Sequence, residues 1–295
     1  MTNETSVDER LILPTGRTIG WARYGDPNGK AVIAAHGSPD SRVTWKLLDA
    51  SARAHGVRIV AIDRPGFGIS DPLPGRTVLD WPSDVTAVAD HLQIDRFPLI
   101  AISGGAAYAA ATAWKHPDRV TGLGLFSVIG PLDHAGALEG TNRPVRATYT
   151  MARRTPWLLK PIATALARGA MRHPERTANQ VERTRPPEDR VVLARLEVRA
   201  VLIENLPNQF RDPKTVVHEF RLAVQPWGFP LEEITTPTHI WQGGRDDVHT
   251  PAMARYLAAR IPGAELTYEP TFSTFTFLDH LDPIVATVAA WAQNP

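Results

Sequence analysis

A serine between a strand pattern and a helix pattern is the first candidate for chemistry in this chain. The stretch LIAISGGAAYAAA, residues 99–111, reads as an apolar strand, then Ser103 with two glycines, then an alanine-rich helix. A serine on such a sharp turn is exposed as a nucleophile, and Gly104 and Gly105 let backbones approach closely. The stretch fits G-x-S-x-G, with Ala101 in place of the first glycine. The alternative is that Ser103 only caps the helix.

The elements that must position Ser103 alternate between strand and helix along the chain. A hairpin is expected within residues 11–24, turning at Thr15-Gly16, because alternating apolar residues flank a turn dipeptide. Further strands are expected at 31–35, 57–63, 97–102, 120–128, 238–243 and 264–269, and helices at 42–55, 82–92, 104–116 and from near Asp282-Pro283. This alternation predicts an α/β fold with a mostly parallel sheet and helices on both faces.

The alternation stops near residue 131 and resumes near residue 229. We therefore expect a core domain formed by 1–131 and 229–295, with a helical lid, 132–228, inserted between two strands. A lid there would cover the carboxyl ends of the strands, where open α/β sheets bind ligands. Residues 143–190 hold eleven Lys or Arg against four Asp or Glu, which we interpret as a solvated helix face.

Composition narrows the classes of function. The formal net charge of +1 argues against nucleic acid or anionic membrane as a partner. The absence of cysteine excludes disulfides and thiolate chemistry, and no apolar run reaches the roughly 20 residues needed to span a bilayer. The polar start MTNETSVDER does not resemble a signal peptide. We expect a cytoplasmic protein with a small-molecule substrate, no cofactor and no metal, and leave its oligomeric state open.

Four segments resemble motifs of the α/β-hydrolase superfamily. HGSPDSR (36–42) is similar to the H-G-T-P-G-S-R oxyanion segment of a bacterial branch, and DRPGFGISDP (63–72) to its D-R-P-G-x-G-x-S-D-P turn. Residues 103–120 resemble the nucleophile helix, and WQGGRDDVHTPAMARYLAARIPGA (241–264) resembles the acid-bearing strand with the helix after it. The resemblance covers nearly the whole chain and implies the α/β-hydrolase fold with a helical lid.

The resemblance also assigns roles. It implies that the backbone N–H groups of Ser38 and Gly104 stabilise an oxyanion, with Gly37 shaping the loop. It places the acid at Asp246, with the adjacent Asp247 as the alternative. We interpret His36 on the same loop as a hydrogen-bonded structural residue.

The family's catalytic histidine is missing from its usual place. Family members carry G-H-F after the last strand, whereas PTFSTFTFL (270–278) has Thr274 at the histidine position. Without a base the serine is a poor nucleophile, and losing a triad member lowers the rate by as much as ~10⁶-fold. We therefore predict that ordinary Ser-His-Asp hydrolysis is disabled. His280, six residues on, is the nearest possible substitute, and His134, His218 and His249 remain open.

These residues favour a repurposed enzyme. The expected chemistry is cyclisation, C–C bond formation or cleavage, or elimination on a bulky apolar molecule of secondary metabolism. Phe272 and Phe275 would then form an apolar wall beside the serine. Two alternatives are a carboxylic-ester hydrolase that uses a substitute base such as His280, and a ligand-binding protein without catalysis. Fold alone does not choose among them.

Overall fold

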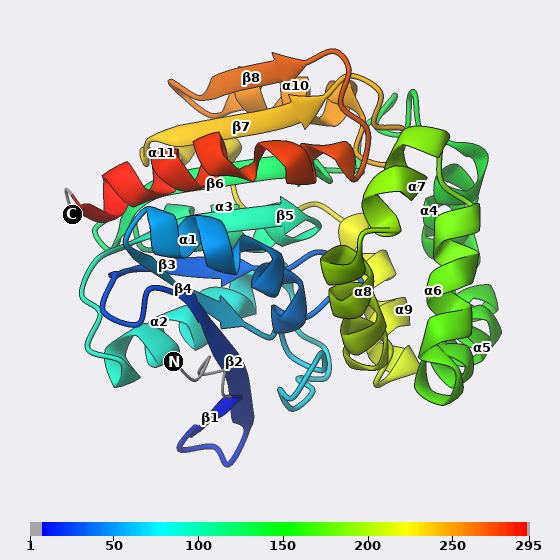
Figure 1. Ribbon diagram of the computed structural model, residues 1–295, viewed down its shortest axis with the longest axis horizontal. Helices are drawn as coiled ribbons and strands as arrows, with labels where there is room; N and C mark the ends of the chain where they lie inside the picture. The colour runs from blue at the N-terminus through cyan, green and yellow to red at the C-terminus, as the bar shows by residue number, and fades with distance from the viewer. Residues whose placement is uncertain (1–7, 294–295) are drawn as a thin grey trace.

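An eight-stranded sheet runs through the middle of the computed structural model, which describes residues 8–293 (Figure 1). The spatial order is β1-β2-β4-β3-β5-β6-β7-β8. β2 is antiparallel to both of its neighbours, and all pairs from β4 to β8 are parallel. The strands are β1 (Glu9–Ile12), β2 (Thr18–Gly25), β3 (Lys30–Ala35), β4 (Val57–Ile62), β5 (Phe97–Ser103), β6 (Val120–Val128), β7 (Thr238–Gly243) and β8 (Glu265–Glu269).

Helices cover both faces of the sheet and form two apolar cores. On one face lie α1 (Asp49–Ala54) and α11 (Leu281–Gln293), and on the other lie α2 (Trp81–His91), α3 (Gly105–Lys115) and α10 (Pro251–Arg260). Successive strand residues point to opposite faces. In β3, Val32 therefore packs in the α11 core and Ile33 in the α3 core. Burial of both faces explains why the central strands are apolar throughout.

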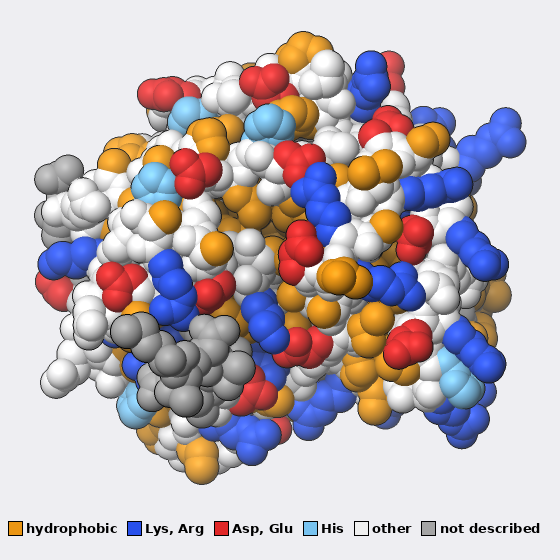
Figure 2. Space-filling view, viewed as in Figure 1, with side chains coloured by type: hydrophobic (Ala, Val, Ile, Leu, Met, Phe, Trp, Pro, Cys, Tyr) orange, Lys and Arg blue, Asp and Glu red, His pale blue; other side chains and the backbone are white. Residues whose placement is uncertain are grey.

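The helices between β6 and β7 form a separate layer at the end of the sheet toward which the parallel strands point (Figure 1). Lys and Arg side chains are spread over this end of the molecule (Figure 2). The helices are α4 (Arg143–Arg154), α5 (Leu159–Arg172), α6 (Pro174–Arg183), α7 (Pro187–Leu193), α8 (Leu196–Gln209) and α9 (Pro213–Ala223), with the short η3 (Pro156–Leu158) between α4 and α5. We refer to them as the helical insertion.

The predicted α/β-hydrolase architecture is confirmed, strand by strand, within one or two residues at most ends. The helix expected at 42–55 divides into a 3₁₀ segment, η1 (Arg42–Leu48), and α1, because η1 begins at its own cap, Ser41, and turns Trp45 and Leu48 into the core. Three more 3₁₀ segments connect the core elements: η2 (Val78–Asp80), η4 (Leu231–Glu233) and η5 (Thr276–His280).

The structure does not test two of the predictions from the sequence, namely the domain boundaries and the character of the N-terminal stretch. The division into a core and a lid at residues 131 and 229 stays a prediction, although the helical insertion falls within the expected range. Most of the polar N-terminal stretch, residues 1–7, lies outside the described residues. Within residues 8–293, no helix is both long enough and apolar enough to cross a membrane.

Candidate active site

Ser103 occupies the sharp turn between β5 and α3. Its φ angle is +55°, in the left-handed region that a residue with a side chain rarely adopts. The backbone is fixed there because the Ser103 carbonyl accepts a hydrogen bond from Ile129 N at 3.1 Å and α3 begins at Gly105. Strain of this kind persists only where the surrounding structure imposes it, and it is common at functional sites. The turn presents the Ser103 hydroxyl at the carboxyl edge of the sheet.

A histidine lies within hydrogen-bond reach of this hydroxyl. His249 Nε2 is 2.9 Å from Ser103 Oγ, and His249 Nδ1 is 3.0 Å from Asp246 Oδ2. Because Asp246 accepts from Nδ1–H, Nε2 is left free to accept the serine proton. The three side chains therefore form a serine–histidine–aspartate relay with the geometry of a triad.

Hydrogen bonds within and next to the loop after β7 hold Asp246 and His249 in these positions. Asp246 Oδ1 accepts from the backbone N of Val248 at 3.0 Å and of His249 at 2.9 Å, a turn that aspartate side chains favour. The His249 carbonyl accepts from Gln242 Nε2 at 2.6 Å. Two residues later Pro251 begins α10, where its missing N–H is no loss. A histidine three residues after the acid is thereby turned back toward Ser103.

The expectation that Thr274 leaves Ser103 without a base nearby does not fit this geometry, because His249, one of the histidines left open, lies beside the serine. The imidazole beside Ser103 belongs to the loop that carries Asp246 and not to the segment after β8. Thr274, at the position where the resemblance leads us to expect a histidine, donates its Oγ1–H to Asp246 Oδ1 at 2.8 Å. The signal in the sequence was the spacing D-x-x-H just before a helix-starting Thr-Pro, in a loop already expected to carry the acid.

Asp246 remains ionised in spite of its burial. Only 3% of the residue is exposed, and burial alone would raise the pKa of the carboxyl. The charge interaction with His249 and the hydrogen bonds from His249 and Thr274 outweigh burial and hold the Asp246 pKa below its ordinary value. An ionised Asp246 can stabilise the imidazolium that forms when His249 takes a proton. The adjacent Asp247 faces away and accepts from Asn142 Nδ2 at 3.0 Å, at the start of α4.

The other candidate histidines lie elsewhere. His280 stacks on Phe272, with ring centroids 4.2 Å apart, and both residues line a second cavity beside α11 rather than the one at Ser103. Their predicted places at the site are therefore not observed, because the 3₁₀ segment η5 turns His280 away from the serine. His134 stacks on Tyr256, and His218 Nε2 lies 2.8 Å from the Arg76 carbonyl.

The loop after β3 faces the nucleophile turn. Ser38 and Gly104 lie side by side, since a Cβ on Gly104 would come 2.4 Å from Ser38 Oγ. Within residues 8–293, no acceptor takes the backbone N–H of either residue, so both amides are free to meet an oxyanion. His36 is fully buried between Arg64 N and the Gly37 carbonyl. Burial, then the charge of Arg64, lowers the His36 pKa, which fits a neutral structural residue.

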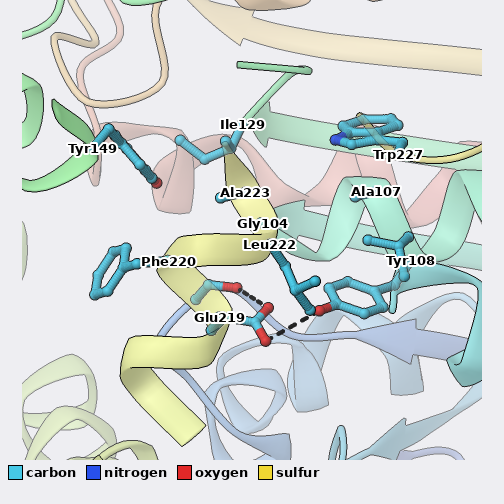
Figure 3. A pocket seen from close by; sticks show the side chains of 12 residues that line it. Gly104, Ala107, Tyr108, Ile129, Tyr149, Glu219, Phe220, Leu222, Ala223 and Trp227 are labelled. Carbon is cyan, nitrogen blue, oxygen red and sulfur yellow. Dashed lines mark hydrogen bonds between the residues drawn. The ribbon is translucent and has the colours of Figure 1, made fainter. Parts of the chain in front are cut away.

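A buried carboxylate of the helical insertion anchors this loop. Glu219 Oε1 in α9 accepts from Ser38 Oγ at 2.9 Å and pairs with Arg64 at 3.0 Å. Its other oxygen pairs with Arg76 and accepts from Tyr108 OH at 3.1 Å. Figure 3 shows the Glu219 and Tyr108 side chains pointing toward each other and joined by this hydrogen bond in the lining of a small cavity. Burial alone would raise the Glu219 pKa, but the two arginines outweigh it and lower it to about 2.

A cavity of about 370 Å³ opens beside Ser103 and His249 and beneath the helical insertion. Its walls are mainly apolar and include the expected aromatic residue Phe275, together with Phe277 at its base. The insertion contributes part of the apolar lining: Leu166, Val181, Leu193, Val198, Val201, Leu202, Leu206 and Phe210. The chamber suits a ligand with a bulky apolar part.

Comparison with known proteins assigns the family. The model of the alpha/beta hydrolase family matches residues 32–286, so the chain belongs to that family. A probable proline iminopeptidase of Leptolyngbya boryana is 34% identical over 119 residues, 38% of this chain and 36% of that protein. Epoxide hydrolase B of Mycobacterium tuberculosis is 30% identical over 126 residues, 40% of this chain and 35% of that protein. The chain thus matches about a third of the length of these curated relatives.

Solved structures share the fold over almost the whole chain. An alpha/beta hydrolase fold protein from Chitinophaga pinensis superposes with a TM-score of 0.70 at 15% identity, covering 99% of this chain and 98% of that one. The enol-lactonase from Burkholderia xenovorans gives a TM-score of 0.65 at 20% identity, covering 97% and 100%. At these identities the likeness shows the fold alone.

Proposed function

We propose that this protein is a serine hydrolase that cleaves carboxylic esters through Ser103, His249 and Asp246. The observation that carries the proposal is the His249 ring, which lies 2.9 Å from Ser103 Oγ and 3.0 Å from Asp246 Oδ2. The hydrolase names of the curated relatives support the same class of reaction.

The chemistry follows from this geometry. His249 Nε2 takes the proton of Ser103 Oγ as the oxygen attacks the ester carbonyl carbon. The carbonyl oxygen becomes an oxyanion and meets the free amides of Ser38 and Gly104. The protonated His249 then gives its proton to the leaving alcohol, and the acyl group stays on Ser103. A water that loses its proton to His249 attacks the acyl-enzyme and releases the acid, which regenerates the serine.

The substrate class follows from the cavity. A volume of about 370 Å³ with mainly apolar walls favours an ester with a bulky apolar group over a short polar one. The helical insertion provides one wall, so it shares in selecting the substrate. Non-hydrolytic chemistry was favoured on the premise that no base reaches Ser103, and His249 removes that premise.

Three proteins test the proposal: the wild type, His249→Gln and His280→Gln. We expect a fluorophosphonate probe to label Ser103 of the wild type and kcat/KM for 4-nitrophenyl butyrate to fall roughly 10³- to 10⁶-fold in His249→Gln. His280→Gln is the matched control, since its ring packs on Phe272 away from the serine, and it should stay within a few-fold of wild type.

The opposite pattern would overturn the assignment. Loss of hydrolysis in His280→Gln with His249→Gln unaffected would return the role of base to the segment after β8. Absence of both labelling and hydrolysis in a folded wild-type protein would exclude a serine hydrolase. Turnover of an ester to a cyclised or rearranged product without water uptake, followed by mass spectrometry in H₂¹⁸O, would favour the non-hydrolytic alternative.

A further inference from the structure

Asp40 introduces a negative charge into the wall of the cavity beside the nucleophile. It stands where the oxyanion segment of the resembled family branch has a second glycine, H-G-T-P-G-S-R against HGSPDSR here. Asp40 is only 8% exposed, yet it lines the same cavity as Ser103 and His249. A glycine would close the turn without any charge, so this carboxylate is a feature of the present chain that the triad does not require.

The surrounding residues hold the carboxylate but leave part of it free. Oδ1 accepts from Ser41 N at 2.8 Å and from Asn205 Nδ2 of α8 at 2.5 Å. Asn205 is itself fixed by Ser41 Oγ, which donates to Asn205 Oδ1 at 2.5 Å. Oδ2 accepts one long bond, 3.2 Å, from Gly37 N. A carboxylate has about four acceptor positions, so Oδ2 retains one for a ligand.

The free oxygen lies close to the reacting centre. A Cβ placed on Gly37 would sit 3.2 Å from Ser103 Cβ and 3.3 Å from Asp40 Oδ2, so the two side chains flank one methyl-sized space. A substrate carbonyl bound at Ser103 therefore has this carboxylate only a few bonds away. An uncompensated anion there opposes the charge that develops on the oxyanion, whereas a substrate cation beside it removes that penalty.

The protein supplies no cation for this carboxylate at contact distance. Within the described part of the chain, no Lys, Arg or His forms an ion pair with Asp40. Arg185 is the only Lys or Arg among the described residues that line the cavity, and its guanidinium lies over the Phe275 ring, 5.4 Å from the centroid. Burying an unpaired carboxylate is unfavourable, and a bound ammonium group would relieve that cost.

We propose that Asp40 is a substrate-recognition residue that binds a protonated amine carried a few bonds from the scissile carbonyl. The preferred substrates are then amino-functional esters whose remaining part is bulky and apolar. This inference rests on the proposed hydrolase function, because it places the amine relative to an acyl group on Ser103. It adds the chemical class of the substrate, which the triad alone leaves open.

Two thioesters of equal shape test the proposal. S-(2-dimethylaminoethyl) thiobutyrate carries a protonated amine near neutral pH, and S-(3-methylbutyl) thiobutyrate replaces it with a CH group. Released thiol can be followed with a thiol reagent because the chain has no cysteine. We expect wild type to prefer the amine in kcat/KM, and Asp40→Asn to lower that preference roughly 10- to 100-fold while still hydrolysing the neutral thioester.

Further variants keep the outcome clear. Asp40→Gly, the residue of the family pattern, should lose the preference in the same way if Asp40→Asn folds poorly. Asp133→Asn, a change at an exposed carboxyl that does not line the cavity, should keep it. An amine preference that survives both Asp40 variants would overturn the role of Asp40 while leaving the hydrolase proposal intact.

A binding measurement separates this inference from the proposed function. In Ser103→Ala, calorimetric titration with the two intact thioesters should show tighter binding of the amine, and Asp40→Asn in the same background should abolish the difference. This result would support amine recognition even if wild type hydrolysed neither thioester, an outcome that would count against the hydrolase proposal alone. Equal binding of the two thioesters, or binding of neither, would overturn the inference.

Discussion

At the scale of single residues, Thr274 and His249 bind different oxygens of the Asp246 carboxylate. His249 Nδ1 bonds to Oδ2 of Asp246, and His249 Nε2 lies within hydrogen-bond distance of Ser103 Oγ. Thr274 Oγ1 donates to Oδ1 of Asp246. The hydroxyl at 274 therefore acts as a positioning group. Together with the backbone N–H groups of Val248 and His249, it holds Oδ1 of the carboxylate so that Oδ2 faces the imidazole.

We predict that Thr274→Val weakens both stability and turnover. The change removes a hydrogen bond to a charged carboxylate, worth about 1.5–3 kcal/mol, which urea unfolding should detect. The value of kcat should fall roughly tenfold, far less than in His249→Gln, because the imidazole still bonds to Oδ2. Thr271→Val changes an exposed neighbour in the same way and serves as the control. If stability and kcat both match wild type, the hydroxyl does not hold Asp246.

Asp40 should make stability depend on pH. Burial raises its pKa to about 6, even though Asn205, Ser41, Gly37 and the charge of Arg64 all favour the ionised form. An unfolded aspartate has a pKa of about 3.9, so between these values the native state binds more protons. Its contribution to folding is fully present only below about pH 3.9 and is lost as pH rises through about 6. A difference of about two pKa units corresponds to about 3 kcal/mol.

The variant Asp40→Asn should therefore gain roughly 2 to 3 kcal/mol in stability relative to wild type between pH 4 and pH 7.5. Urea unfolding gives the free energy of unfolding of both proteins at the two pH values. Comparing the change with pH in the variant with that in wild type removes any effect of the Asn side chain that does not depend on pH. Asp133→Asn, exposed and outside the cavity lining, should show no such gain. Parallel stability profiles for wild type and Asp40→Asn would mean that the carboxyl titrates normally.

At the scale of elements, the helical insertion is attached to the core through buried polar groups as well as apolar contacts. Glu219 of α9 pairs with two core arginines, and Asn205 of α8 bonds to Asp40. Asp189 of α7 accepts from Ser273 Oγ and from Phe275 N, which fixes the segment that carries Thr274. Each of these insertion residues contacts a loop of the candidate site, so the insertion helps to set the site's geometry.

Glu219→Gln tests this attachment. The change leaves Arg64 and Arg76 buried without their shared anion, which should cost about 3–5 kcal/mol at pH 7. The native Glu219 pKa is about 2, so its contribution is present above pH 4.3 and is lost as pH falls toward 2. The penalty of the variant should shrink accordingly in acid. Glu204→Gln removes an exposed pair with Lys46 and should cost no more than about 1 kcal/mol. Equal costs for the two variants would contradict this account.

At the scale of the whole molecule, the core and the helical insertion should unfold together. Separating the insertion from the core would leave charged groups without their partners in apolar surroundings. A state in which only one of the two parts is folded is therefore unfavourable. The polar contacts that join them include those of Glu219 with Arg64 and Arg76, Asn205 with Asp40, Asp189 with Ser273, and Asn142 with Asp247. We expect a single calorimetric transition, coincident with loss of helical circular dichroism. Two resolved transitions would show that the insertion is an independent unit.

Much of this architecture could be predicted because local patterns and the fold agree. The apolar runs that become β4 and β6 are recognisable from the sequence, and the turn at Ser103 needs the small residues found there. The base could not be predicted with the same ease. His249 reaches Ser103 only because a turn around Asp246 redirects the chain, and such a turn depends on side-chain bonds rather than on periodicity. Asp40 and Glu219 were missed because their partners come from distant helices.

The three-residue spacing between Asp246 and His249 has a consequence for other chains of the same family. Here one short loop carries both Asp246 and His249, so a change in the segment after β8 leaves an imidazole within reach of Ser103. In other chains of the family that lack a histidine after the final strand, the third residue after the acid is therefore a place to look for a substitute histidine.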